Sequence, residues 1–312
     1  MTIDPGLFQL TPVVREALEN GLPVVALEST IITHGMPAPA NLQTAQQAEQ
    51  AIRDGGATPA TIAVLDGKIR IGLHGRELER LADETSPARK CSLRDLPLMP
   101  GSKHNGGTTV AATLHLARMV GISVFATGGI GGVHRGAQST LDISADLAAL
   151  SNNALVVVCA GPKAILDLGL TLEYLETLGV PVLGYRTGHL PAFWYRESNY
   201  LLDQRVDSAE AAALILKNQR ALGLQSGILL CNPIPAEHAL PPEQVEKAIE
   251  SAMTASIEAR IAGKALTPFL LEHVMTATGG DSLVANQALM RSNARLAAEI
   301  AVQLCQVRAS DG

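Results

Sequence analysis

Aromatic side chains are scarce in this chain, since Phe, Trp and Tyr make up only 3% of its 312 residues. Hydrophobic residues nevertheless reach 47% of the sequence, so Ala, Val, Ile and Leu must fill the core. An aliphatic core of this kind suits a β-sheet covered by helices. No low-complexity tract or flexible linker divides the sequence, and we expect a single domain over residues 1–312.

Cysteine and basic charge are also in short supply. The 4 cysteines are widely separated, with no Cys-x-x-Cys pair and no histidine at zinc-finger spacing. We expect reduced, mostly buried thiols at Cys91, Cys159, Cys231 and Cys305. The net charge of -6 argues against a nucleic-acid partner, because binding of phosphodiesters needs a basic surface. Local basic groups can still hold a small anionic ligand.

A leader sequence and a membrane-spanning run are not expected from this sequence. Residues 1–10 contain Asp4 and have neither a basic start nor a long apolar stretch, which excludes a secretory signal. No apolar segment is long enough to cross a bilayer. We therefore expect a cytoplasmic protein with no membrane partner.

Short β-branched runs alternate with longer helical patterns along the chain. Strands are predicted at Val24–Leu27, Thr61–Leu65, Ile122–Ala126, Ala154–Cys159, Val180–Gly184 and Gly227–Leu230. Helices are predicted at Asn41–Arg53, Thr108–Met119, Thr171–Leu178, Ala209–Ala221, Pro242–Ile261 and Leu283–Leu304. This order predicts an α/β fold, a three-layer α/β/α arrangement with a largely parallel or mixed central sheet. Residues 93–107 are expected to form a long ordered loop, and the mostly helical C-terminal third to wrap the sheet or form a subunit contact.

The first polar cluster follows the predicted strand Val24–Leu27. Glu28 is followed by the hydroxyls of Ser29, Thr30 and Thr33 and by His34. Ligands bind at the carboxyl ends of strands in open α/β sheets, where Glu28 would serve as a general acid or base. A helix cap or a solvated loop carboxylate is the alternative.

Two glycine-containing segments follow. Gly106 and Gly107 precede Thr108 and Thr109 at the start of a helical pattern, where free amides favour an anion; helix capping by threonine explains the same residues. Residues 127–136 contain five glycines with His134 and Arg135, which can donate to a phosphate or a base or can simply face solvent. Neither segment completes a P-loop or a dinucleotide fingerprint.

Two further segments carry candidate ligands. Asp142, Ser144 and Asp146 alternate before a helix; carboxylates in such spacing can bind a divalent cation, although helix capping by Ser144 or Asp142 suits the spacing better. Lys163 follows the predicted strand ending at Cys159. A lysine whose pKa is lowered at such a position can form a Schiff base, and a solvated surface lysine is the alternative.

Taken in order, these segments resemble the pseudouridine-5'-phosphate glycosidases, also called indigoidine-synthase-A-like proteins, over nearly the whole chain. The matching segments are Ala26–Ile32, His34–Pro37, Gly107–Thr113, Phe125–Gly136, Asp142–Leu147, Cys159–Gly161 with Lys163, Thr171–Thr177, Asn232–Pro235, Thr267–Leu271, and Ser282–Leu283 with Ala285–Asn286. The chain departs from the family pattern at Leu93, Pro162 and Ala164.

The resemblance implies reversible cleavage of pseudouridine 5'-phosphate to uracil and ribose 5-phosphate, in pseudouridine catabolism. It implies one largely water-coordinated Mn²⁺ per subunit and a homotrimer. Glu28 matches the proton donor, Lys163 the nucleophile and Asp142 the metal ligand. Substrate-binding positions are expected at Lys90, Val110, Ser144, Ala145, Asp146, His134 and Asn286, together with Thr108, Thr109 and Thr127 of the glycine-containing segments.

This reaction differs from ordinary glycoside hydrolysis because ribose is joined to a carbon of uracil, so two carboxylates are not sufficient. We expect Glu28 to protonate the sugar ring oxygen while the amine of Lys163 adds at C1'. Two other functions fit the same residues: a metal-independent Schiff-base lyase acting on another sugar phosphate, and a regulatory module that binds a phosphosugar without catalysis.

Overall fold

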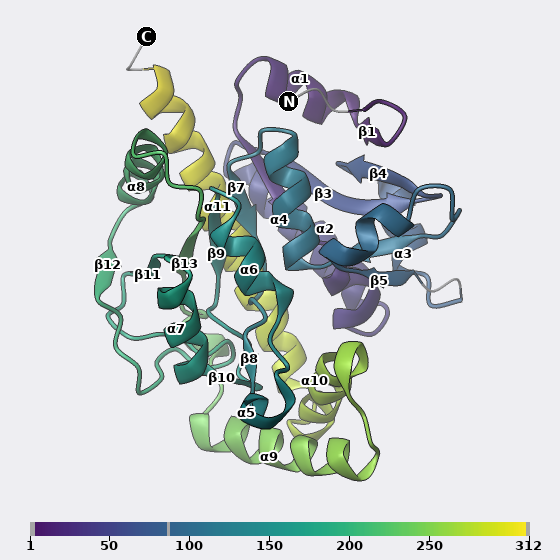
Figure 1. Ribbon diagram of the computed structural model, residues 1–312, viewed down its shortest axis with the longest axis vertical. Coiled ribbons are helices and arrows are strands. Elements are labelled where there is room, and N and C mark those ends of the chain that lie inside the picture. The colour runs from purple at the N-terminus through teal and green to yellow at the C-terminus, as the bar shows by residue number, and fades with distance from the viewer. Residues whose placement is uncertain (1–3, 86–87, 310–312) are drawn as a thin grey trace.

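A computed structural model describes residues 4–85 and 88–309 and contains an 11-stranded sheet (Figure 1). The sheet comprises β1 (Phe8–Leu10), β2 (Val24–Leu27), β3 (Thr58–Leu65), β4 (Lys68–Ile71), β5 (Arg89–Cys91), β6 (Gly106–Thr108), β7 (Val124–Ala126), β9 (Val156–Cys159), β11 (Val182–Tyr185), β12 (Gln204–Val206) and β13 (Ile228–Cys231). Two further short strands, β8 (Val133–His134) and β10 (Leu166–Asp167), pair with each other in antiparallel orientation.

The main path of the sheet runs β1-β4-β3-β2-β7-β9-β13-β11-β12, and the β5–β6 pair branches from β3. Strands from β3 to β12 along this path are parallel to their neighbours. Only the β3–β4 and β3–β6 pairs of this sheet are antiparallel in the described part of the chain. The central strands β2, β9 and β13 are buried along their whole length, as expected for parallel strands covered on both faces.

Helices cover both faces of the sheet. They are α1 (Pro12–Glu19), α2 (Ala40–Asp54), α3 (Gly75–Ala82), α4 (Val110–Met119), α5 (Ala137–Thr140), α6 (Ala145–Ser151), α7 (Leu168–Thr177), α8 (Ala209–Ala221), α9 (Pro242–Glu258), α10 (Leu266–Ala277) and α11 (Asp281–Ala309). In Figure 1, α4 and α6 lie in front of the sheet, and α11 runs behind it in contact with α2 and α8. The predicted three-layer α/β fold with a largely parallel, mixed sheet is confirmed.

Each predicted strand and helix overlaps an observed one, but several bounds differ, and the start of α4 differs for a physical reason. Thr108 belongs to β6 and α4 begins at Val110, after Thr109 as the N-cap residue. Residues 93–107 contain the short helix η2 (Leu93–Leu98) and the start of β6. Two of the three residues of β6 are glycines, which weaken strands in isolation, so pairing with β3 and β5 decides this element.

The C-terminal third is mostly helical, as expected, and α11 packs on the sheet rather than extending away from it. Cys91, Cys159 and Cys231 are buried free thiols, and burial raises the pKa of Cys91 to about 12. Within the described ranges, no helix is both long enough and apolar enough to cross a membrane. The single domain stays a prediction.

Candidate active site

A cavity of about 410 Å³ lies among the loops at the carboxyl ends of β2, β7 and β9. It is also bounded by β5, by the start of α10 and by α11. Of the residues predicted to form the site, those that line the cavity are Glu28, Lys90, Thr109, Val110, His134, Asp142, Ser144, Ala145, Asp146, Lys163 and Asn286. Thr108 and Thr127 are fully buried and are not among the lining residues.

Glu28 directly follows the last residue of β2 and is 8% exposed. Its carboxyl Oε1 accepts a hydrogen bond of 2.5 Å from the hydroxyl of Thr127, the residue after β7. Burial raises the pKa of Glu28, and the charge of Lys163 and the Thr127 hydrogen bond oppose this effect only in part. The raised pKa favours the protonated form, which a proton donor requires.

The hydroxyl groups beside Glu28 hold the strand ends together. Ser29 Oγ donates to the carbonyl of Ile62 at 2.7 Å and accepts the N–H of Thr108 at 2.9 Å. The Thr108 hydroxyl donates to the same carbonyl at 2.6 Å. The predicted substrate contact of Thr108 is therefore not supported, because its polar groups fasten β6 to β2 and β3. Thr33 Oγ1 lies 2.6 Å from Nδ1 of His34.

The start of α4 is held by a protein carboxylate. Asp146 accepts the N–H of Ala111 at 2.9 Å through Oδ1 and the N–H of Gly131 at 2.8 Å through Oδ2. Thr109 Oγ1 accepts the N–H of Ala112 at 3.4 Å as an N-cap. A negative group at a helix N-terminus is favourable, and here Asp146 supplies it. The capping interpretation of Thr109 is thus confirmed, and the expected phosphate site on the α4 amides is largely occupied.

Lys163 lies on a tightly held turn after β9. Gly161 has a φ of +85°, and a Cβ at this position would lie 2.1 Å from the carbonyl oxygen of Pro191. The N–H of Lys163 donates to the carbonyl of Ile130 at 3.1 Å. In the part of the chain that the structure describes, the Lys163 ammonium has no hydrogen-bonding partner, and the residue lines the cavity.

Arg135 holds this turn from outside. Its guanidinium donates to the carbonyls of Ala164 at 3.1 Å and Leu166 at 3.5 Å, and it pairs with the carboxylate of Glu246 at 2.9 Å. Arg135 does not line the cavity. A contact with a phosphate or a base was one of the two roles left open for Arg135, and the structure gives it no support, because its donors bind the lysine turn and helix α9.

Lys90 brings a second lysine into the cavity from β5. Burial lowers the pKa of Lys90, the positive charge of Lys163 lowers it further, and the carboxylates of Asp146 and Glu28 oppose the shift. Two lysines and two carboxyl groups, Lys90, Lys163, Glu28 and Asp146, therefore line one cavity.

Asp142 and His134 also line the cavity. The N–H of His134 donates to the carbonyl of Asp142 at 3.0 Å. Burial lowers the pKa of His134, although the charge of Asp142 opposes the shift, which favours a neutral imidazole. The Asp142 carboxylate accepts no hydrogen bond from any described residue. Ser144 caps α6 by accepting the N–H of Asp146 at 3.2 Å, so capping is confirmed for Ser144 but not found for Asp142.

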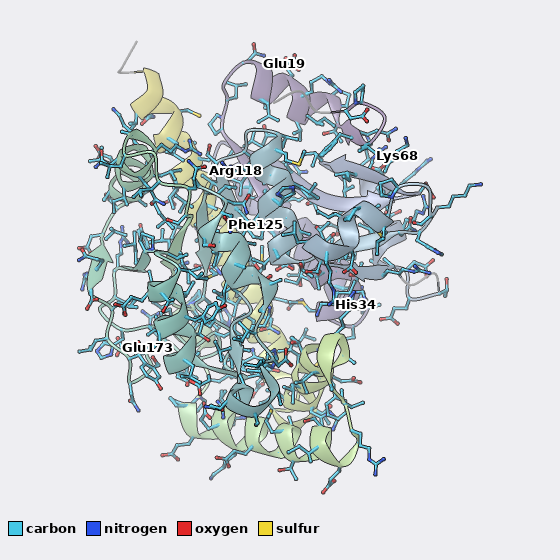
Figure 2. The ribbon with its side chains drawn as sticks, in the orientation of Figure 1. Glu19, His34, Lys68, Arg118, Phe125 and Glu173 are labelled. Carbon is cyan, nitrogen blue, oxygen red and sulfur yellow. The ribbon has the colours of Figure 1, made fainter. Side chains whose placement is uncertain are left out.

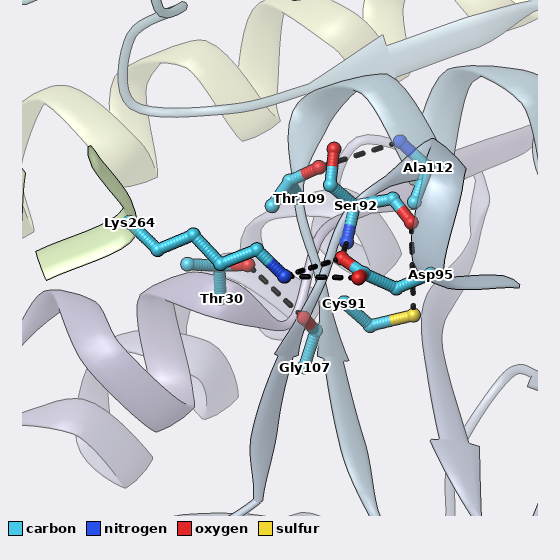
Figure 3. A network of polar contacts seen from close by, with 8 residues as sticks. All are labelled: Thr30, Cys91, Ser92, Asp95, Gly107, Thr109, Ala112 and Lys264. Carbon is cyan, nitrogen blue, oxygen red and sulfur yellow. Dashed lines mark hydrogen bonds and ion pairs between the residues drawn. The ribbon is translucent and has the colours of Figure 1, made fainter. Parts of the chain in front are cut away.

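The helical hairpin of α9 and α10 borders the cavity through its connection and the start of α10, which contribute Lys264, Thr267 and Leu271 to the wall. Lys264 lies in η4 (Gly263–Ala265), and its ammonium donates to both carboxylate oxygens of Asp95 (Figure 3). Figure 2 shows His34 on the side of the molecule that faces this hairpin, consistent with the contact between α10 and η1 (Ile31–Gly35).

Lys264 and Arg94 are two cations of the cavity wall to which the sequence patterns assigned no role. One signal was present, because Lys264 lies three residues before the Thr267–Leu271 segment that resembles the family.

Asn286 of α11 faces the cavity beside a pair of aromatic residues. Its Oδ1 accepts the indole N–H of Trp194 at 2.7 Å, and the Trp194 ring meets the Phe193 ring edge to face at 5.2 Å. Phe193 also lines the cavity. The wall therefore offers an aromatic ring next to an amide whose nitrogen has no partner among the described residues, a combination suited to a planar polar base.

The sequence profile of the indigoidine synthase A like protein family matches residues 13–303. The chain belongs to this family. Within it, the chain is 54% identical over 294 residues to pseudouridine-5'-phosphate glycosidase 2 of Photorhabdus laumondii subsp. laumondii, covering 94% of each sequence. It is 52% identical to pseudouridine-5'-phosphate glycosidase of Escherichia coli K12, covering 96% of each sequence.

Two solved structures of related proteins share the fold. The prealnumycin C-glycosynthase AlnA, crystallised with ribulose 5-phosphate, is 39% identical with a TM-score of 0.90, and the alignment covers 99% of this chain and 100% of AlnA. An indigoidine synthase A (IdgA)-like protein from Thermotoga maritima is 35% identical with a TM-score of 0.88, over 98% of this chain and 99% of that protein.

Proposed function

We propose that this chain cleaves pseudouridine 5'-phosphate to uracil and ribose 5-phosphate, the activity that the names of its relatives state. One observation carries the proposal: a buried carboxyl with a raised pKa, Glu28, and the amine of Lys163 come from two separate strand ends into one cavity. The pairing of an acid with a lysine nucleophile is what cleavage of a carbon-carbon glycosidic bond demands, since uracil would leave as a poor carbanion.

In the proposed reaction, protonated Glu28 gives its proton to the ring oxygen while the neutral amine of Lys163 bonds to C1' and the C1'–O4' bond breaks. The nitrogen that has added to C1' gives up a proton to the ionised Glu28, and this proton passes to the uracil carbon as the carbon-carbon bond breaks, which leaves the opened sugar as an imine on Lys163. Water adds to the imine, and ribose 5-phosphate leaves with the Lys163 amine restored. Glu28, now ionised, acts as the base in this last stage.

The phosphate of the substrate is proposed to lie among the cations of the cavity. Lys90, Arg94 and Lys264 all line it. Ser92 is a further lining residue that can donate through its hydroxyl. This placement replaces the expected site on the α4 amides, two of which bind Asp146 and Thr109.

A divalent metal, expected to be Mn²⁺, fits Asp142. No group of three His, Cys, Asp or Glu side chains suited to a metal occurs in residues 4–85 and 88–309. Hard cations of this kind are often bound by one or two carboxylates and several waters, and the Asp142 carboxylate lines the cavity and accepts no hydrogen bond from a residue that the structure describes. When bound there, the ion would add positive charge beside the oxygens of the substrate.

The first experiment follows the release of uracil by its absorbance after mixing with pseudouridine 5'-phosphate and Mn²⁺. Sodium borohydride added during turnover should attach a reduced pentose phosphate to Lys163, detected by peptide mass. A Lys163→Ala protein of full activity would overturn the covalent scheme. Binding of the substrate without any uracil would indicate a phosphosugar-binding module instead.

The metal proposal has its own readout. Titration with Mn²⁺, followed by the electron paramagnetic resonance signal of the free ion, should show one site per chain that Asp142→Asn weakens at least tenfold. Asp203→Asn, at an exposed position, is the matched control. Full activity after chelation would favour a metal-independent lyase.

We also propose a cytoplasmic homotrimer, as the resemblance implies. Sedimentation equilibrium should give a mass three times that of one chain. A mass equal to one chain would contradict the trimer without affecting the proposed chemistry.

A further inference from the structure

Thr127 was expected to bind the substrate, but its surroundings give it another role. It is fully buried, and its hydroxyl makes the 2.5 Å bond to Oε1 of Glu28. This distance is typical of a hydroxyl that donates to a carboxylate. It is also the only hydrogen bond of the Glu28 carboxyl within the described residues.

The hydrogen bond distinguishes the two oxygens of Glu28. A buried hydroxyl needs an acceptor for its hydrogen, and Oε1 is the acceptor that the structure provides for Thr127. When Glu28 is protonated, the carbonyl oxygen of the carboxyl is the better acceptor for the Thr127 hydrogen, so the hydrogen bond to Oε1 favours the acidic proton on Oε2. Oε2 has no partner in the described part of the protein and belongs to a residue that lines the cavity.

The backbone of Thr127 is bound by a neighbouring strand and by helix α11. Its N–H donates to the carbonyl of Val158 on β9 at 3.0 Å. Its carbonyl accepts a 2.9 Å hydrogen bond from Nδ2 of Asn293, a fully buried residue of α11. Asn293 in turn accepts from the amide of Asn232, whose N–H donates to the carbonyl of Cys159. The backbone that carries the hydroxyl is therefore held in place beside Glu28.

We infer that Thr127 is a positioning residue for the proton donor, whose hydroxyl directs the transferable proton to Oε2 of Glu28, toward the reacting atoms. The inference rests on the proposed function, which makes Glu28 the donor. Thr127 acts through Glu28 and does not touch the substrate.

The test is the pH dependence of kcat for Thr127→Val, which keeps the shape of the side chain and removes the hydroxyl. Cleavage needs protonated Glu28, and the lost hydrogen bond stabilised its ionised form. The pKa of Glu28 should rise, so the alkaline limb of kcat should move up by about one to two pH units. At the plateau, kcat should fall about tenfold or more because the proton is no longer directed, with KM within about threefold.

Thr127→Ser should restore the wild-type limb and most of kcat. Thr113→Val is the matched control, because Thr113 is a fully buried threonine whose hydroxyl donates to Thr108 and not to Glu28. The alkaline limb of its kcat–pH profile should coincide with that of the wild type even if its melting temperature falls. A Thr127→Val protein with an unshifted limb, or Ser and Val proteins with the same defect, would overturn the inference.

The outcome is separable from the proposed function. If the wild-type protein releases no uracil, the proposed function fails. The relationship between the two residues is then measured by carbon-13 NMR titration of the glutamate carboxyls. Thr127→Val must raise the pKa of the Glu28 carboxyl, and an unchanged titration would refute the positioning role.

Discussion

The ammonium of Lys264 lies 2.9 Å from Oδ1 and 2.8 Å from Oδ2 of Asp95. This pair joins the α9–α10 hairpin to η2, the short helix that follows the strand carrying Lys90. Asp95 Oδ2 also accepts the N–H of Ser92 at 2.9 Å. The Asp95 carboxylate therefore connects Ser92, a lining residue of the cavity, to Lys264 of the α9–α10 hairpin. Desolvation acts against ionisation of Asp95, but the Lys264 hydrogen bonds and charge outweigh it and lower the pKa.

Replacing Lys264 with Met should weaken substrate binding more than turnover. The variant loses both a cation of the proposed phosphate site and the link to Asp95, so we expect KM to rise about tenfold and kcat to change less than about threefold. Steady-state kinetics at two salt concentrations would measure this. Lys247→Met, an exposed lysine on α9, is the control and should match the wild type. An unchanged KM for the Lys264 variant would contradict the placement of the phosphate.

Replacing Glu28 with Gln should abolish most of the turnover while leaving binding nearly intact. A positioned general acid contributes about 10²–10⁴-fold, and glutamine cannot give up a proton. We expect kcat to fall by about this factor with KM within about threefold, and Glu173→Gln on the exposed face of α7 to be neutral. A glutamine variant with more than a tenth of wild-type kcat would exclude Glu28 as the donor.

The same variant should change the pH dependence of stability. The folded-state pKa of Glu28 is raised from its ordinary value near 4.5 by burial. The stability that Glu28 contributes is therefore complete below this ordinary value and is lost as pH rises through the raised pKa. In urea unfolding, the free energy of unfolding of Glu28→Gln relative to that of the wild type should increase between pH 5 and pH 9. A difference that does not change with pH would contradict the raised pKa.

We expect Arg135 to support turnover because its guanidinium binds the backbone carbonyls of Ala164 and Leu166, beside Lys163. Arg135→Gln frees the turn that carries Lys163, and a small displacement of a nucleophile is costly, so we expect kcat to fall about tenfold. Glu246→Gln removes only the partly exposed ion pair, which is worth little, and should keep near-wild-type kcat. Equal losses of kcat in Arg135→Gln and Glu246→Gln would contradict a role of Arg135 through these carbonyls.

Gly161 should tolerate no side chain. An alanine at this position would have to adopt the positive φ of +85°, and its Cβ would lie 2.1 Å from the carbonyl oxygen of Pro191. Gly223 also has a positive φ, of +72°, but open space around it. Gly223→Ala should therefore cost only the backbone strain of roughly 1–2 kcal/mol. Gly161→Ala should cost at least about 2 kcal/mol more and slow borohydride trapping at Lys163. Equal denaturation midpoints would contradict the close approach.

The sequence predicted well those elements whose signals are local. The strand Val24–Leu27 and the helix Ala209–Ala221 were predicted with the observed bounds. In the helix, Ser208 accepts the N–H of Ala211 as an N-cap and Gly223 follows the end, and both signals are readable without neighbours. Strands β5 and β6 were missed because each has three residues and exists only through pairing, β5 with β6, and β6 with both β5 and β3.

The sequence by itself determined which residue types end the central strands, and hence that Glu28 and Lys163 reach the same edge of a parallel sheet. Only the tertiary structure decided the partner of each polar group. Asp146 is bonded to the amides of Ala111 and Gly131, whereas Asp142, four residues earlier, has no described donor. Thr127 likewise lies 99 residues from Glu28. Hydrogen bonds are short and directional, so segments distant in the sequence must be folded together before a side chain has a partner.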